Sequence, residues 1–204
     1  MMFELHQAIV QQLPSPALYR HNTLPFFERH LAREGLTLGA FRGDALIAYA
    51  LVRFPRLQPD NLGRHFGLPG SDLLGVGHLE ECGVAPAYRR CGIHTEMTRR
   101  RLAILESLGY RYAAVTVAPA NLFSLRVQLA CGLEAVAIAK KYGGFDRIQI
   151  PVPVGTPTAA LEPTALTEAA AHKGSLMIEV CIPLALLQEA EKKIKEGEKV
   201  TILK

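Results

Sequence analysis

The segment from Val84 to His94 most constrains how this chain can fold. An apolar, strand-like stretch precedes it, and a helical pattern of apolar residues runs from Ile93 to Leu108. Such a corner binds anions, because the first N–H groups of a helix lack intrahelical partners. Gly92 lets the backbone approach an anion closely, and Arg89 and Arg90 can add charge-assisted hydrogen bonds. The segment therefore indicates a phosphate-binding turn, although an ordinary turn with solvated arginines would show the same spacing.

A second block of the sequence also reads as a strand, a turn and a helix, and it begins soon after the helical pattern that ends at Leu108. The β-branched and apolar run 112–117 predicts a buried strand, and 122–130 predicts a helix. Gly132 suits the end of that helix, where a left-handed conformation is needed. Asn121 and Ser124 lie at the helix start, and Asn121 can be explained as its N-cap without any ligand.

Together the two blocks resemble the GNAT superfamily of N-acetyltransferases. That family carries Val-x-Pro at a strand end, then Arg/Gln-x-x-Gly-x-Gly/Ala; this chain has Val84-Ala85-Pro86 and Arg89 to His94, with His94 in place of Gly or Ala. The resemblance implies an α/β (α+β) fold with a mixed, mostly antiparallel sheet flanked by helices on both faces. It also implies that acetyl-CoA is the co-substrate and that the turn holds its pyrophosphate. The implied cofactor-binding residues are Cys82, Val84, Arg89, Arg90, Cys91, Gly92, Ile93, His94, Asn121 and Ser124.

The strand before the turn carries the candidates for the general base that amine acetylation needs. Glu80 is the first choice and Glu81 the second, and His78 titrates near neutrality without any shift. Alternation places His78, Glu80 and Cys82 on one face and Glu81 on the other, whereas a bulge would invert this order. Each glutamate could instead face solvent or pair with an arginine. Gln128 stands where the family often has a tyrosine acid.

The function that this pattern favours is acetyl transfer to a primary amine of a small molecule, with a protein amine as the less favoured acceptor. The alternative is a non-catalytic acyl-CoA-binding sensor or scaffold, which His94 and Gln128 favour. The two readings differ in whether cofactor binding is followed by turnover.

Charge and cysteine content exclude several other classes of protein. The net charge of +4 suits an anionic cofactor but is too small to indicate nucleic-acid binding. No apolar run approaches the roughly 20 residues of a membrane helix. The cysteines are scattered without metal-ligand spacing, so we expect reduced thiols, no metal site and a cytoplasmic location.

The chain order predicts an acetyltransferase domain over residues 1–154 and a linker with a C-terminal extension over 155–204. Broken helices occupy about the first 35 residues, and two strands, 36–41 and 45–53, precede a loop over 54–75. A strand pair, 134–141 and 146–154, ends the domain. The extension reads as strand–helix–strand, and it packs either on the sheet or on a second subunit, so a homodimer is one alternative. Its expected elements are 164–171, 175–182, 184–195 and 200–203.

Overall fold

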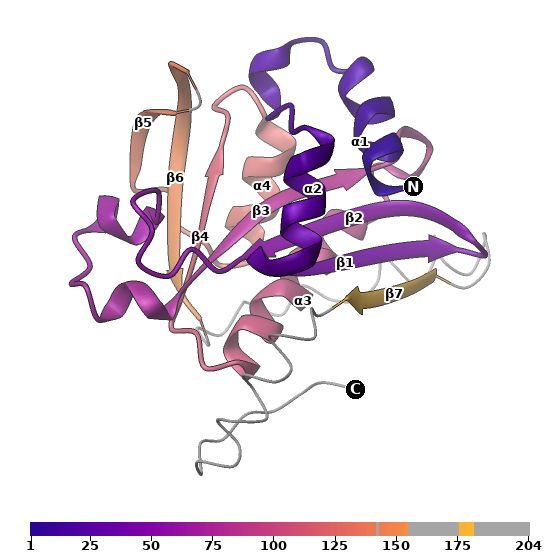
Figure 1. The fold of residues 1–204 in the computed structure, drawn as a ribbon. Coiled ribbons are helices and arrows are strands. Elements are labelled where there is room, and N and C mark those ends of the chain that lie inside the picture. Colours follow the sequence, from indigo (N-terminus) through magenta and orange to yellow (C-terminus); the bar gives the residue numbers. More distant parts are fainter. Residues whose placement is uncertain (142, 155–175, 182–204) are drawn as a thin grey trace, which may run out of the picture.

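Among the described residues, seven strands form one sheet that organises the protein (Figure 1). The computed structural model describes residues 1–141, 143–154 and 176–181. The strands lie in the order β5-β6-β4-β3-β2-β1-β7. Their bounds are β1 Gly35–Arg42, β2 Ala45–Arg53, β3 Val76–Val84, β4 Tyr112–Val117, β5 Ala137–Lys141, β6 Phe145–Pro153 and β7 Leu176–Cys181.

Every neighbouring pair of strands is antiparallel except β3 and β4, which confirms the predicted mixed sheet. The short turn between β1 and β2 includes Gly43, whose φ of +56° favours glycine. β3 and β4 are parallel because the chain crosses from one to the other through a helix.

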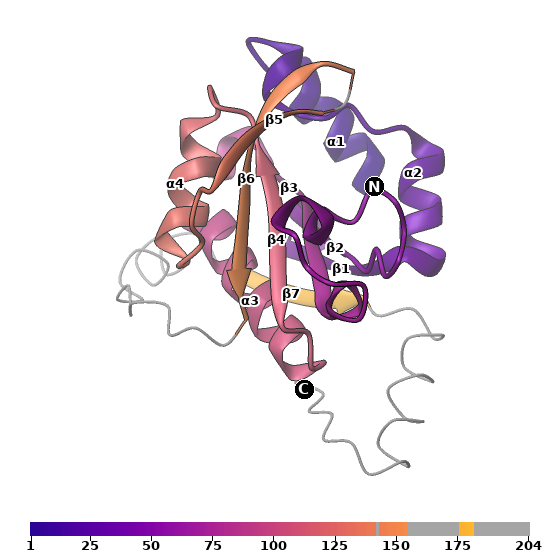
Figure 2. The ribbon, with the colours of Figure 1, turned by 90° about the vertical axis from the view of Figure 1, so that its left-hand side faces the viewer.

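Helices cover both faces of the sheet, as Figure 2 shows. Helices α1 (Met2–Gln11) and α2 (Leu24–Arg29) lie on one side, which we call the α1 face. Helices α3 (Ile93–Ser107) and α4 (Leu122–Ala130) lie on the other side, the α3 face. Each face has its own apolar core. The α3-face core includes Leu36, Leu38, Met97 and Leu105, and the α1-face core includes Ile9, Phe27, Tyr49 and Leu51.

The predicted loop between β2 and β3 is an anchored segment with two short 3₁₀ helices, Leu62–Phe66 and Asp72–Gly75. Leu62 is buried against β3 and β4. Asn61 caps the first of these helices through the Gly63 amide and also donates to the Leu73 carbonyl. The loop therefore has a fixed course over the α1 face.

The C-terminal strand that the sequence predicts at 175–182 is observed as β7, which pairs antiparallel with β1 at the sheet edge. The first strand of the later hairpin begins at Ala137, three residues after the expected start at Glu134. The remaining elements predicted for the extension, at 164–171, 184–195 and 200–203, lie outside the described residues.

Candidate active site

The parallel strands β3 and β4 separate soon after they begin. Figure 1 shows them side by side at one end and diverging toward the other. Beyond this point β3 continues against β2, and β4 continues against β6. We call the opening between Leu79–Val84 and Val115–Val117 the splay. The paired positions are Val76 with Tyr112, Gly77 with Ala113 and His78 with Ala114.

A β-bulge lies in β3 beside the splay. The register of β2 against β3 shifts there, so that Leu51 alone faces both Glu80 and Glu81. Leu79 and Cys82, on either side of the two glutamates, both pack into the α3-face core. Glu80 and Glu81 consequently both point to the α1 face. Simple alternation would have separated them, and the bulged alternative is the one observed.

Glu81 occupies a buried polar cluster on the α1 face. The Tyr49 hydroxyl donates to its Oε2 at 3.0 Å, and the Asn22 amide donates to its Oε1. His6 Nδ1 lies 3.4 Å from Oε2 and 2.9 Å from the Tyr49 hydroxyl. The Tyr19 hydroxyl lies 3.4 Å from that of Tyr49. Burial, followed by Tyr19 and Glu81, raises the pKa of Tyr49, which therefore remains a protonated donor to the carboxylate.

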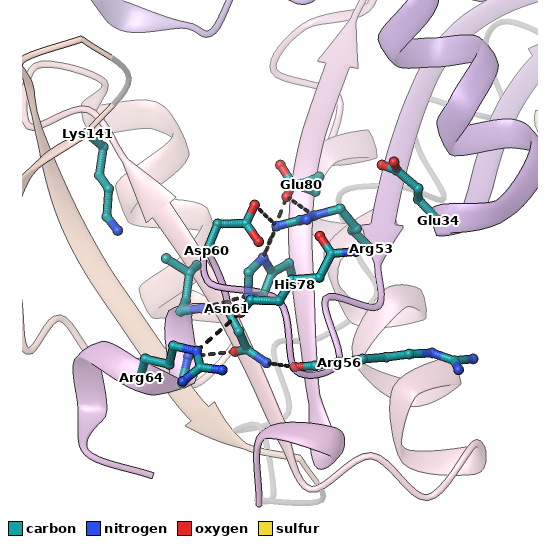
Figure 3. Close-up of polar contacts among 12 residues, drawn as sticks. Glu34, Arg53, Arg56, Asp60, Asn61, Arg64, His78, Glu80 and Lys141 are labelled. Atoms are coloured by element: carbon teal, nitrogen blue, oxygen red, sulfur yellow. Dashed lines mark hydrogen bonds and ion pairs between the residues drawn. The ribbon is translucent and has the colours of Figure 1, made fainter. Parts of the chain in front are cut away.

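Glu80 lies in a different network, which Figure 3 shows. Arg53 donates to Glu80 at 3.0 Å and to Asp60 at 2.8 Å. Burial alone would raise the pKa of Glu80, but the hydrogen bonds and charges of His78 and Arg53 outweigh it and lower the pKa to about 2. The Glu80 carboxylate is therefore a weak base that is held in an ion pair.

His78 is 3% exposed and is held by its neighbours. The amide of Leu62 lies 2.9 Å from Nε2. Because an amide N–H is only a donor, Nε2 accepts this hydrogen bond. Nδ1 lies 3.1 Å from Nη2 of Arg53. Nδ1 is 3.6 Å from the Glu80 carboxylate. Burial is the main cause that lowers the pKa of His78, so the ring is neutral near pH 7. These contacts give His78 a structural role, linking the loop to β3.

Two segments far apart in the sequence meet over the α1 face. Lys141, at the end of β5, contacts the His65 ring from the first 3₁₀ helix. Figure 3 shows Lys141 reaching toward the Asp60 side of the Arg53 network. The β2–β3 loop and the β5–β6 hairpin thereby form a common wall on the Asp60 side of the network that holds Glu80.

The turn before α3 has the backbone that its glycine predicts. Gly92 has a φ of +75° and is the N-cap of α3, which receives no hydrogen bond from a capping side chain. Arg90 also has a positive φ, +63°, and its guanidinium lies 5.6 Å from the Phe123 ring centre. Arg89 folds back to the Val84 carbonyl at 3.3 Å. Both arginines are exposed at the start of a helix whose N–H groups and dipole favour an anion.

The residues around this turn face inward to different degrees. Ile93 is buried in the α3-face core, and Cys91 contacts the carbonyl of Arg89. His94 is half-buried; burial first and the charge of Arg101 second lower its pKa to about 3. Burial raises the pKa of Cys82 to about 11, although Arg101 partly offsets this effect. His94 and Cys82 are therefore both uncharged near pH 7.

The start of α4 follows β4, the second of the two strands that border the splay. The side chain of Asn121 accepts from the Ser124 amide at 3.1 Å and donates to the Leu18 carbonyl at 3.4 Å. Asn121 is thus the N-cap of α4, the explanation that needs no ligand. Its bond to Leu18 also anchors the segment that carries Tyr19. Gln128 is 2% exposed, and its Oε1 has no hydrogen-bond partner among the described residues.

Arg101 is a buried residue that the sequence interpretation missed. It lies within the arginine run 99–101, yet its exposure is 0%. One signal was present: Arg101 is four residues from both Met97 and Leu105, which are buried on the inner side of α3. No local pattern pointed to Tyr49, His6 or Asn22, because they reach Glu81 from three separate elements of the fold.

Comparison with known proteins supports a single family. The sequence profile described as "Acetyltransferase (GNAT) family" matches residues 2–133. Comparison with curated protein sequences finds no match. Among the described residues no group of His, Cys, Asp and Glu could hold a metal ion, and no helix is long and apolar enough to cross a membrane.

Solved structures with this fold act on or bind different molecules. The ribosomal-protein-S18-alanine N-acetyltransferase from Escherichia coli is 16% identical, with a TM-score of 0.56, covering 78% of this chain and 92% of its own. Arabidopsis thaliana NAA60, in complex with acetyl-CoA, is 16% identical with a TM-score of 0.57, covering 76% and 94%. Aminoglycoside acetyltransferase AAC(6')-Ib, in complex with coenzyme A and kanamycin, is 18% identical with a TM-score of 0.57, covering 75% and 87%. At these identities the likeness establishes the fold.

Proposed function

The chain belongs to the acetyltransferase (GNAT) family, and on that premise we propose that it transfers the acetyl group of acetyl-CoA to a primary amine of a small molecule. The observation that supports this proposal is the bulge, which brings two carboxylates to the α1 face beside the splay while the anion-binding turn lies at the end of the same strand.

The residues of the turn and the splay fit acetyl-CoA. The left-handed Gly92 leaves no Cβ at the helix start, and α3 has no side-chain cap to compete for its first N–H groups. We propose that the backbone at 91–94 binds the pyrophosphate, with Arg89 and Arg90 beside it. The edge of β3 that faces the splay at Cys82 and Val84, together with Asn121 and Ser124, would hold the pantetheine arm. When bound, the thioester supplies an activated acetyl group.

Glu81 is the residue that we propose as the general base. The ion pair of Glu80 with Arg53 makes that carboxylate a weak proton acceptor, which reverses the order of preference drawn from the sequence. Glu81 accepts hydrogen bonds from Tyr49 and Asn22, and a carboxylate retains further acceptor sites after two such bonds. It can therefore remove a proton from an ammonium while its two donors fix its orientation. Glu80 would help to position the cationic acceptor, while His78 keeps the loop against β3.

The wall formed by Lys141 and His65 supports a small acceptor over a protein one. Contact between the loop and the hairpin narrows the approach to the glutamates from that side. We further propose that residues 1–154 form the acetyltransferase domain, that 155–204 are a linker and extension, and that the protein is cytoplasmic. Free thiols at Cys82, Cys91 and Cys131 support the last point.

A turnover screen tests this function. Coenzyme A release would be followed with amino acids, polyamines, aminoglycosides and N-terminal peptides, while calorimetry measures coenzyme A binding. We expect at least one small amine to be acetylated faster than any peptide. Coenzyme A binding without turnover of any amine would instead identify a non-catalytic acyl-CoA sensor or scaffold. Preferential acetylation of a peptide would overturn the small-molecule acceptor.

A further inference from the structure

The buried guanidinium of Arg101 contacts both strands at the bulge. One of its nitrogens donates to the carbonyls of Leu51 and Glu80, each at 3.2 Å. A second nitrogen donates to the Thr98 hydroxyl at 3.1 Å, and Nε lies 3.4 Å from the Met97 carbonyl. None of these four partners is a carboxylate. A positive charge with 0% exposure is thus devoted to backbone and hydroxyl oxygens.

The bulge creates the need for such a donor. Two residues of β3 face one residue of β2, so the ladder cannot pair every peptide group at this place. A buried carbonyl without a partner is costly, and water cannot serve where Arg101 and Leu51 are both fully buried. Arg101 comes from α3 on the opposite face from the two glutamate side chains. It satisfies the bulge carbonyls without occupying the space beside Glu81.

The bulge also decides which face carries the proposed base. With regular alternation through β3, a strand that keeps Glu80 on the α1 face would turn Glu81 toward the α3 face. Tyr49 and Asn22 could then no longer reach its carboxylate. We propose that Arg101 is a positioning residue that holds the β3 bulge and so keeps Glu81 on the α1 face beside the splay. This inference rests on the proposed role of Glu81 as the base.

A double-mutant cycle between Arg101 and Glu81 tests the inference. Arg101→Met keeps most of the side-chain length and removes all its donors. If Arg101 acts through Glu81, Glu81→Gln should reduce the turnover number about 100-fold in the natural protein. In the Arg101→Met background it should cost no more than about threefold, because the carboxylate is already misplaced. Multiplicative losses in the cycle would overturn the inference.

Further variants separate positioning from general destabilisation. Arg100→Met, on the same helix, removes an exposed arginine paired with Glu96, and turnover should be unchanged. Arg101→Lys keeps a charge and three donors, so it should restore part of the activity lost in Arg101→Met and covers the case in which Arg101→Met does not fold. A fully active Arg101→Lys enzyme in which Glu81→Gln still lowers the turnover number about 100-fold would also support positioning, because the lysine would then hold the bulge. Arg101→Lys as inactive as a variant without any donor would contradict it.

A readout that does not depend on activity keeps this inference separate from the proposed function. If the natural protein acetylates no amine, the proposed function fails. A crystal structure of the Arg101→Met variant then still shows whether the bulge depends on Arg101. We expect regular pairing of Leu51 with a single residue of β3, or a new donor at the two carbonyls. An unchanged bulge with both carbonyls left without a donor would show that Arg101 does not hold it.

Discussion

Tyr49 on β2 donates a hydrogen bond of 3.0 Å to Glu81 on β3, from a position with 0% exposure. The two residues are 32 positions apart in the chain, and only the bulge brings the carboxylate to the hydroxyl. The bond joins the apolar core of the α1 face to the proposed base.

Tyr49→Phe should therefore destabilise the protein by about 1.5–3 kcal/mol, because a buried hydrogen bond to a charged group is lost while the ring is kept. Denaturant unfolding would measure the change. Tyr88→Phe is the matched control, because the Tyr88 hydroxyl accepts from Arg42 at an exposed site and its loss should change stability by less than about 0.5 kcal/mol. Equal losses in both variants would show that the hydroxyl contact with Glu81 contributes nothing special.

The two adjacent glutamates should differ in catalysis although they share a face. Glu81→Gln should lower kcat about 100-fold or more, the usual effect of removing a general base. Glu80→Gln should mainly raise KM for the amine, by less than about tenfold, because Glu80 is one of two carboxylates that Arg53 binds and Asp60 remains after the substitution. Steady-state kinetics on the best amine of the screen distinguishes the two. The reverse order of effects would assign the base to Glu80.

How much of this the sequence could predict depends on the range over which each contact acts. The turn at Gly92, the cap at Asn121 and the succession of strands along the chain follow from local patterns, and all are observed. The partners of Glu81 come from α1, β2 and the segment before α2, so no spacing along the chain reveals them. A bulge is also invisible to alternation, because one extra residue inverts the face of every residue beyond it.

Arg101 illustrates a different limit. Runs of arginine usually mark a solvated surface. In the run 99–101, however, the spacing of Arg101 from Met97 and Leu105 places its side chain inside the protein. A charge inside an apolar core is tolerated only where oxygen atoms are placed to accept its hydrogen bonds. Those oxygens belong to the bulge, which tertiary structure alone defines.

Acid should weaken the fold through Glu80. Its pKa is lowered from 4.5 to about 2, so the unfolded chain binds a proton here at a pH where the native protein does not. The stabilisation is present above pH 4.5 and is lost as the pH falls toward 2. Urea unfolding between these values should show a shallower loss in Glu80→Gln than in the natural protein. Glu4→Gln, at an exposed site, should leave the slope unchanged. A slope in Glu80→Gln equal to that of the natural protein would refute the assignment.

The phosphate turn gives the last prediction, since the cofactor proposal depends on it. Gly92→Val should weaken coenzyme A binding at least about tenfold, roughly 1.4 kcal/mol. Its φ of +75° is unfavourable for a β-branched residue, and a shift of the backbone would misdirect several N–H groups together. Gly109, at the other end of α3, has a φ of +78° and open space around it. Gly109→Val therefore carries a similar backbone strain without touching the turn, and it should lose stability but keep its affinity. Calorimetry on both folded variants makes the comparison. If both bind coenzyme A as the natural protein does, the turn does not hold the pyrophosphate, whereas equal weakening would trace the effect to strain in α3.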